Sequence, residues 1–78
     1  MKFKLLECVI LNTDIPDHGL RAGDVGTVVE TYEPDGLEVE FMSASGDTQA
    51  VVTLTVLDVR KASANDMLAA RPLHPSSA

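Results

Sequence analysis

Basic residues, aromatic residues and cysteine are all scarce in this chain, and each scarcity excludes a class of function. The 78 residues include six Lys or Arg against twelve Asp or Glu, no Trp, one Tyr, two Phe and one Cys. The resulting net charge of −6 repels phosphate backbones and anionic lipid headgroups, so we expect neither a nucleic-acid partner nor membrane binding. We expect a basic protein partner instead, because opposite charge raises the rate of encounter.

Residues that build catalytic or metal centres are also few. One cysteine cannot form an internal disulfide, and no Cys/His cluster supplies four metal ligands. Cys8 lies in the apolar run LLECVIL, where a free thiol is expected to be buried. No glycine-rich phosphate motif opens a helix, and His74 lies in a tail that cannot hold a nucleophile's base in place. We therefore expect no enzyme, no catalytic residues and no cofactor.

Long hydrophobic runs are missing as well. No stretch approaches the roughly 20 apolar residues that cross a bilayer. The apolar run near the start is interrupted by Glu7, and no cleavage site of small residues follows it. These features predict a cytoplasmic protein of bacterial type.

What the chain does contain is alternation of apolar and polar residues with a period of two. Strands are expected over 5–11, 24–33, 37–42, 48–55 and 59–62. A long irregular loop at 12–23, tight turns at 33–36 and 43–47, and one helical turn at 56–58 connect them. Leu37, Val39 and Phe41 should face the core, whereas either face of 48–55 fits it. Gly26 marks a bend, a bulge or a close approach inside its strand.

This pattern predicts an all-β fold, namely a small five-stranded SH3-like barrel over residues 1–62. An OB-fold is the alternative, although it needs a helix between its third and fourth strands, where this chain has only SASGD. In the tail, 63–78, Ser63 and Asp66 resemble a capping box and predict a short helix at 64–71, with the rest disordered. Met67 and Leu68 would then face an apolar patch, such as one on a second subunit.

The run LNTDIPDHGLRAGDVGTVVETY, followed by LEVEF, TQAVVTLT and VLDVRKA, resembles a family of small bacterial proteins of unknown function. Its members carry the pattern DLPEHGLKxGDVGTVV, from which this chain departs mildly at Ile15, Asp17 and Arg21. The resemblance covers about residues 5–62. The GDVGTV segment is also similar to SH3-like barrels of nitrile hydratase β subunits and of electron-transfer accessory proteins. These resemblances imply a barrel, and the family's members look like the small acidic halves of two-gene cassettes beside a larger, toxin-like protein.

Binding residues on such folds concentrate in long loops and the adjacent strand. The candidate partner-binding residues are Asp14, Asp17, His18, Leu20, Arg21, Glu30 and Tyr32. The leading hypothesis is a non-catalytic module that binds a basic protein, in its narrowest form one that neutralises a toxin-like neighbour.

Two alternatives stay open. The first is a self-associating structural or accessory subunit that uses edge strands together with Met67 and Leu68. The second is a barrel that binds a metal or small ligand through Asp14, Asp17 and His18, although no second cluster completes a coordination shell.

Overall fold

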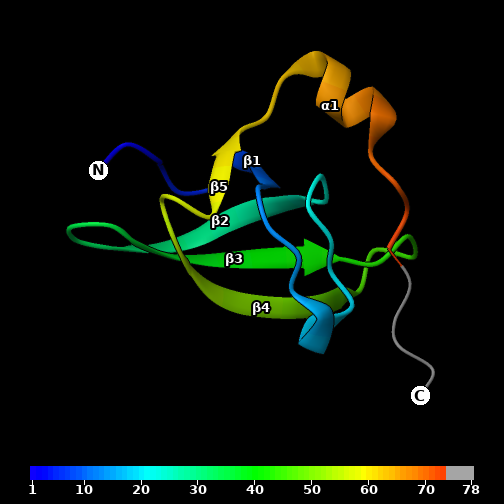
Figure 1. Ribbon diagram of the computed structural model, residues 1–78, viewed down its shortest axis with the longest axis horizontal. Helices are drawn as coiled ribbons and strands as arrows, with labels where there is room; N and C mark the ends of the chain where they lie inside the picture. Colours follow the sequence, from blue (N-terminus) through cyan, green and yellow to red (C-terminus); the bar gives the residue numbers. More distant parts are fainter. Residues whose placement is uncertain (74–78) are drawn as a thin grey trace.

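A five-stranded antiparallel sheet forms the body of the protein (Figure 1). The computed structural model describes residues 1–73. A 3-10 turn lies inside the first loop, and a short helix follows the last strand. The elements in chain order are β1 (Cys8–Leu11), η1 (Pro16–His18), β2 (Val25–Tyr32), β3 (Gly36–Met42), β4 (Thr48–Thr55), β5 (Val59–Lys61) and α1 (Ala64–Ala69).

The predicted closure into a barrel is wrong. The strand order is β4-β3-β2-β1-β5, so within residues 1–73 the sheet ends in two edges that do not pair with each other. The short connection after β4 is a hydrogen-bonded turn, in which the Asp58 N–H donates to the Thr55 carbonyl at 3.0 Å, and not the expected helical turn. This turn delivers β5 to β1, where only three residues pair, and leaves no ladder between β4 and β5.

The core lies on one face of the curved sheet, as the alternation of side chains requires. Leu37, Val39 and Phe41 of β3 are fully buried there, which confirms the prediction for this strand. The pairing of Val39 with Val52 settles which face of β4 points inward. The remaining buried members of the core are Phe3, Val9, Leu11, Leu20, Val28, Leu54, Val59 and Leu73.

Gly26 marks a close approach, one of the three possibilities that the sequence left open. A Cβ atom at this position would stand 2.5 Å from Cγ1 of Val39 and 2.7 Å from Cε1 of Phe41. These side chains from β3 fill the space that any larger residue would need. The bulge in β2 lies further along, between Val28 and Glu30.

The first strand is shorter than expected, and Cys8 is not buried. β1 begins only at Cys8, because the preceding residues turn so that Phe3 enters the core while Leu6 adopts a left-handed φ of 67°. Leu6 itself is 76% exposed. Val9 faces the core, so the alternation of β1 turns Cys8 to the opposite face, where it is exposed although Ile10 on the same face is buried.

The predicted helix is confirmed, although it ends at Ala69 and not at residue 71. Ser63 and Asp66 form the expected capping box. Asp66 also receives two hydrogen bonds from the Arg60 guanidinium, at 2.8 and 2.7 Å. The Arg60 guanidinium and the Ser63 donors hold the pKa of Asp66 well below its usual range. Met67 is 50% exposed and Leu68 is 87% exposed, so neither is buried by the described residues.

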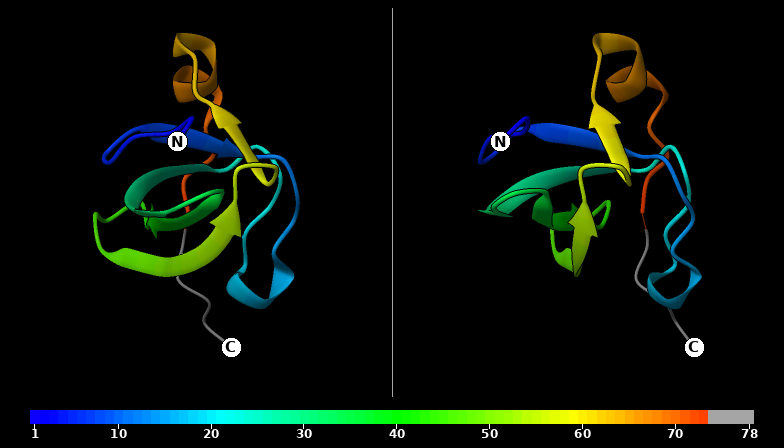
Figure 2. Two further views of the ribbon diagram at one scale, coloured as in Figure 1. Left: turned by 90° about the vertical axis from the view of Figure 1, so that its left-hand side faces the viewer. Right: turned by 60° about the vertical axis from the view of Figure 1, so that its left-hand side comes forward.

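Beyond α1 the chain folds back onto the sheet. Figures 1 and 2 show it descending from α1 to the turn that joins β3 and β4. Leu73, expected to be disordered, is buried in the core, and its carbonyl accepts the Ala44 N–H at 2.6 Å. The rest of the predicted disordered tail, including His74, lies outside the described residues. Neither helix within residues 1–73 has the length and apolar character needed to cross a membrane.

Candidate functional site

The first loop, residues 12–24, is a folded arch and not the irregular segment that the sequence predicts. Ile15 and Leu20 exchange two backbone hydrogen bonds, of 2.9 and 3.1 Å. Between them, Gly19 takes a left-handed φ of 68° and donates its N–H to the Pro16 carbonyl, which closes η1. The Leu20 side chain is buried in the core. The arch is therefore held by its own backbone and by one apolar anchor.

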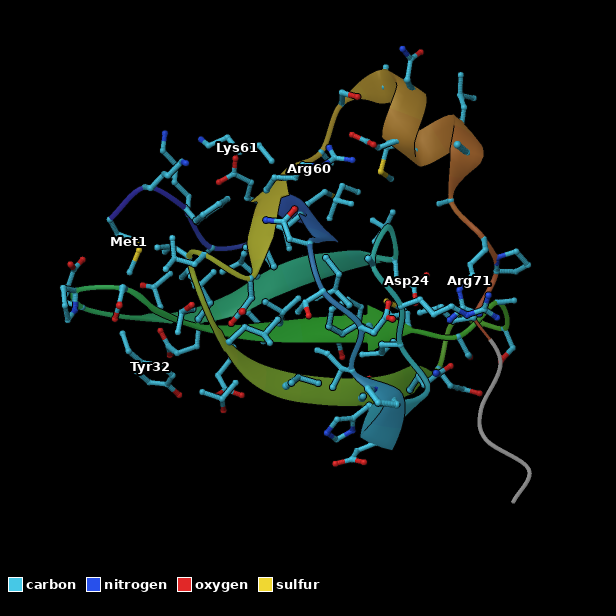
Figure 3. All side chains as sticks on the ribbon, viewed as in Figure 1. Met1, Asp24, Tyr32, Arg60, Lys61 and Arg71 are labelled. Carbon is cyan, nitrogen blue, oxygen red and sulfur yellow. The ribbon has the colours of Figure 1, made fainter. Side chains whose placement is uncertain are left out.

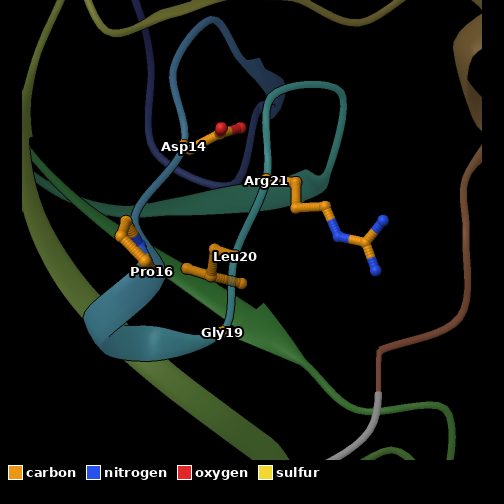
Figure 4. Close-up of a pocket in the computed structure, with 5 residues that line it drawn as sticks. All are labelled: Asp14, Pro16, Gly19, Leu20 and Arg21. Atoms are coloured by element: carbon orange, nitrogen blue, oxygen red, sulfur yellow. The ribbon is translucent and has the colours of Figure 1, made fainter.

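An open hollow of about 390 Å³ lies on this arch (Figure 4). Its lining residues are Asp14, Pro16, Gly19, Leu20 and Arg21, three of which belong to the predicted binding set. The Asp14 carboxylate accepts the Ala22 N–H at 2.8 Å, so one of its oxygens is used to build the loop. The hollow is lined by one acidic and one basic residue together with Pro16, Gly19 and Leu20, and in Figure 4 the Arg21 side chain extends away from the other four.

The remaining loop candidates, Asp17 and His18, are exposed on η1. Throughout residues 1–73, no three side chains of His, Cys, Asp or Glu lie close enough together to hold a metal ion. Asp14, the third residue of the metal hypothesis, is bonded to Ala22. The geometry therefore gives the metal-binding alternative no support.

The strongest ion pair at the loop joins two residues absent from the predicted set, Asp24 and Arg71 (Figure 3). Asp24 ends the first loop and is only 2% exposed. Arg71 donates from Nε to Oδ1 at 2.7 Å and from Nη2 to Oδ2 at 2.9 Å. The same Nη2 also donates to the Gly19 carbonyl at 3.0 Å, and the Arg21 N–H donates to Oδ2 at 2.8 Å. These contacts neutralise a buried carboxylate and give both of its oxygens hydrogen bonds.

The hydrogen bonds that Arg71 donates to Asp24 raise the pKa of the Arg71 guanidinium further above its usual value, so this side chain stays cationic. Sequence reasoning missed this contact because 47 positions separate its partners. One signal was available: Asp24 stands directly before a strand of core residues. A carboxylate that is buried there needs a partner.

Glu30 and Tyr32 do not lie beside the first loop. β2 runs away from the loop, and the seven steps from Val25 to Tyr32 span roughly 20 Å of extended chain. Figure 3 shows Tyr32 and Asp24 far apart on the molecule. The predicted set therefore divides into a loop group and a group at the far end of β2.

Glu30 and Tyr32 belong to the outer face of β2, β3 and β4, which is the face turned away from the core. Glu30 pairs with Glu38 on β3, and Glu40 pairs with Val51 on β4. We call Glu30, Tyr32, Glu38, Glu40 and Val51 the acidic face. The predicted inward face of Leu37, Val39 and Phe41 leaves Glu38 and Glu40 outward. That prediction did not join them to Glu30, because the register of β2 against β3 depends on a bulge.

Among residues 1–73, the carboxylates of the acidic face have no cationic partner. The four ion pairs found within residues 1–73 use other acids. Glu38 and Glu40 accept hydrogen bonds only from the hydroxyls of Thr53 and Thr48. Like charges directly opposite each other weaken a sheet, so this arrangement costs stability. Tyr32, half exposed, adds an aromatic surface to it.

Comparison with known proteins gives one match. Residues 5–61 match the sequence model of DUF4926, which is described as a domain of unknown function. No curated protein and no solved structure matches the chain. The matched segment contains every strand of the sheet and the whole first loop, whereas α1 and Leu73 lie beyond it. The chain therefore belongs to the DUF4926 family of domains of unknown function.

Proposed function

We propose that this protein is a non-catalytic module that binds a basic protein on its acidic face. The single observation that carries the proposal is the unpaired charge of Glu30, Glu38 and Glu40 on three adjacent positions of the outer sheet. A net charge of −6 gives solubility wherever the carboxylates lie, so solubility does not require Glu30 and Glu38 to stand opposite each other. Their placement therefore favours a complementary surface on a partner.

Tyr32 supports the same proposal. Exposed tyrosine is enriched at the centres of protein interfaces, and its ring attracts an arginine or lysine side chain. Here the ring is half exposed and stands on the same strand face as Glu30. An arginine of a partner could therefore stack on the ring and bond a carboxylate at once. The narrowest form of this function is neutralisation of a toxin-like neighbour, which comes from the resemblance to the small acidic halves of two-gene cassettes.

The test uses two variants that change the net charge equally. Glu38→Gln with Glu40→Gln alters the acidic face, and Asp14→Asn with Asp17→Asn alters the first loop; each pair raises the net charge from −6 to −4. A partner is first isolated from a bacterial lysate with the wild-type chain and identified by mass spectrometry. Its association with all three proteins is then measured by surface plasmon resonance across a range of salt concentrations.

We expect the acidic-face variant to associate about three- to tenfold more slowly at low salt, and its rate to depend less on salt. The loop variant should associate nearly as fast as wild type. Equal rates for wild type and the acidic-face variant would contradict the proposal, as would a captured partner whose binding surface is acidic.

A second candidate function, self-association, is favoured by the edge of β4. This strand, TQAVVTLT, has eight residues without charge or proline, although natural edge strands are usually protected by such residues. The N–H of Thr55 donates to Asp58 Oδ2 and its carbonyl accepts the Asp58 N–H, so both groups point away from β3. Alternation directs the backbone groups of Thr53 and Val51 the same way.

Two copies could therefore pair their β4 strands antiparallel about Val51, with Val51 opposite its counterpart. Size-exclusion chromatography with light scattering tests this directly. A dimer that Val51→Lys converts to a monomer, and that Leu68→Lys on α1 leaves intact, would support it. A monomer at high protein concentration would contradict it.

A further inference from the structure

The last described residues, 71–73, occupy a site that the rest of the domain provides. We call this the receptor site: it consists of the Gly19 carbonyl, the Asp24 carboxylate, the Ala44 N–H and the opening in the core that Leu73 fills. Its polar groups come from the first loop and the β3–β4 turn, all within the residues that match the family. The segment that fills it lies outside that match.

The contacts made by residues 71–73 are those of a bound peptide. Arg71 bonds the carboxylate through two nitrogens, a geometry that distinguishes arginine from lysine. Leu73 offers its carbonyl to Ala44 and its side chain to the core. Pro72 between them is exposed and makes no backbone N–H bond. The receptor site therefore recognises an arginine followed, two positions later, by an aliphatic residue.

The chain between β5 and this segment is held only weakly to the sheet. None of the residues of α1 is buried. Asp66 is its ionic link, to the exposed Arg60 side chain. Exposed ion pairs contribute little to stability, so the attachment of the tail depends mainly on Arg71 and Leu73. A segment attached at one end in this way can leave and be replaced without disturbing the strands.

Space for a longer occupant is present beside the receptor site. The hollow on the first loop shares Gly19 with it, and Arg71 touches only the Gly19 carbonyl at that rim. A longer partner segment could contact the hollow, whose lining residues do not include residues 71–73. Such additional contacts are what an incoming peptide needs in order to displace a tethered one.

We propose that the receptor site is a peptide-binding site for an extended segment of the form Arg–x–aliphatic in a partner protein, and that residues 71–73 occupy it in the free protein. This site is separate from the acidic face, so the two proposals succeed or fail independently. The probe is a fluorescein-labelled synthetic peptide, SANDMLAARPL, which reproduces residues 63–73. Binding is measured by fluorescence polarisation to full-length proteins.

The key variant carries Arg71→Ala and Leu73→Ala, which empties the receptor site and keeps its walls. We expect it to bind the peptide at least about tenfold more tightly than wild type, whose own tail competes at a high effective concentration. Adding Asp24→Asn to this variant should weaken binding by about tenfold or more, because the bidentate ion pair is lost. A control peptide with glutamine in place of its arginine should bind equally weakly to the emptied variant with and without Asp24→Asn.

Circular dichroism establishes whether the emptied variant is folded. If it is not, Arg71→Gln alone keeps Leu73 in the core, and its affinity for the peptide should still exceed that of wild type by about threefold. A folded variant that does not bind the peptide would overturn the proposal, as would an affinity that Asp24→Asn leaves unchanged. A wild-type dimer that the double variant abolishes would also overturn it, since the tail of a second copy would then fill the site.

Discussion

Replacing Gly26 by alanine is the sharpest test of the core packing beneath the acidic face and the receptor site. The added Cβ would lie 2.5 Å from Val39 Cγ1 and 2.7 and 3.0 Å from two ring carbons of Phe41. Real Cβ atoms do not approach other carbons so closely, so something must move. Val39 and Phe41 are both fully buried, and their neighbours leave them little room to move.

The expected cost follows from two opposing effects. Overpacking a well-filled core costs about 1–3 kcal/mol. Alanine also restricts the unfolded chain relative to glycine, which returns about 0.4–1 kcal/mol. We therefore expect Gly26→Ala to lower the free energy of unfolding by about 1–2 kcal/mol. In a domain of this size, that corresponds to a fall in Tm of roughly 5–15 °C.

Urea denaturation followed by circular dichroism measures this cost, and a double variant identifies its cause. Val39→Ala removes the methyl group that the new Cβ meets first. If the clash is the cause, the double variant should be more stable than the sum of the two single effects predicts, by at least about 0.5 kcal/mol. A Gly26→Ala protein as stable as wild type, or strictly additive effects, would refute the reasoning.

Three further predictions concern the tail. Asp66→Asn should lower stability at neutral pH, because Arg60 and the Ser63 donors depress the pKa of Asp66 in the folded protein. The stability difference between wild type and variant is complete above about pH 4 and shrinks as acid protonates the carboxyl. Thermal unfolding curves of the two proteins should therefore converge as the pH falls below that value, and a constant gap would contradict the mechanism. Leu73→Ala should cost about 2–4 kcal/mol in urea denaturation, whereas a surface residue of a disordered tail would cost nothing. Asp24→Asn should cost about 1–3 kcal/mol, less than for a fully enclosed pair because a third of the Arg71 side chain is exposed, and a neutral effect would mean that the pair does not hold the tail.

A strand could be predicted most fully where it alternates on its own. In β3 the residues Leu37, Val39 and Phe41 carry the core and their neighbours are polar, so the sequence specifies both the strand and its inward face. In β4 both faces are apolar, and only pairing with β3 decides between them. The prediction of barrel closure failed for a similar reason: closure depends on where a short turn directs β5, and no local sequence pattern specifies that direction.

The candidate site was predictable only where it is local. Asp14, Leu20 and Arg21 were chosen because they lie in a long loop between two strands, and all three line the hollow found there. The partnership of Asp24 with Arg71 joins residues far apart in the sequence. Nothing in the composition of either segment indicates it, since a lone Arg after a short helix usually remains in solvent.

Under the two proposals, the acidic face and the receptor site would make different physical demands on a partner, so one chain could use both. Carboxylates exposed to water act over about a Debye length, so the acidic face influences how fast a basic protein arrives and loses that influence in salt. Asp24 is buried and bonds a guanidinium at contact distance, so the receptor site determines how long an occupant stays. A partner could approach through the first and be retained by the second, its own arginine taking the position of Arg71.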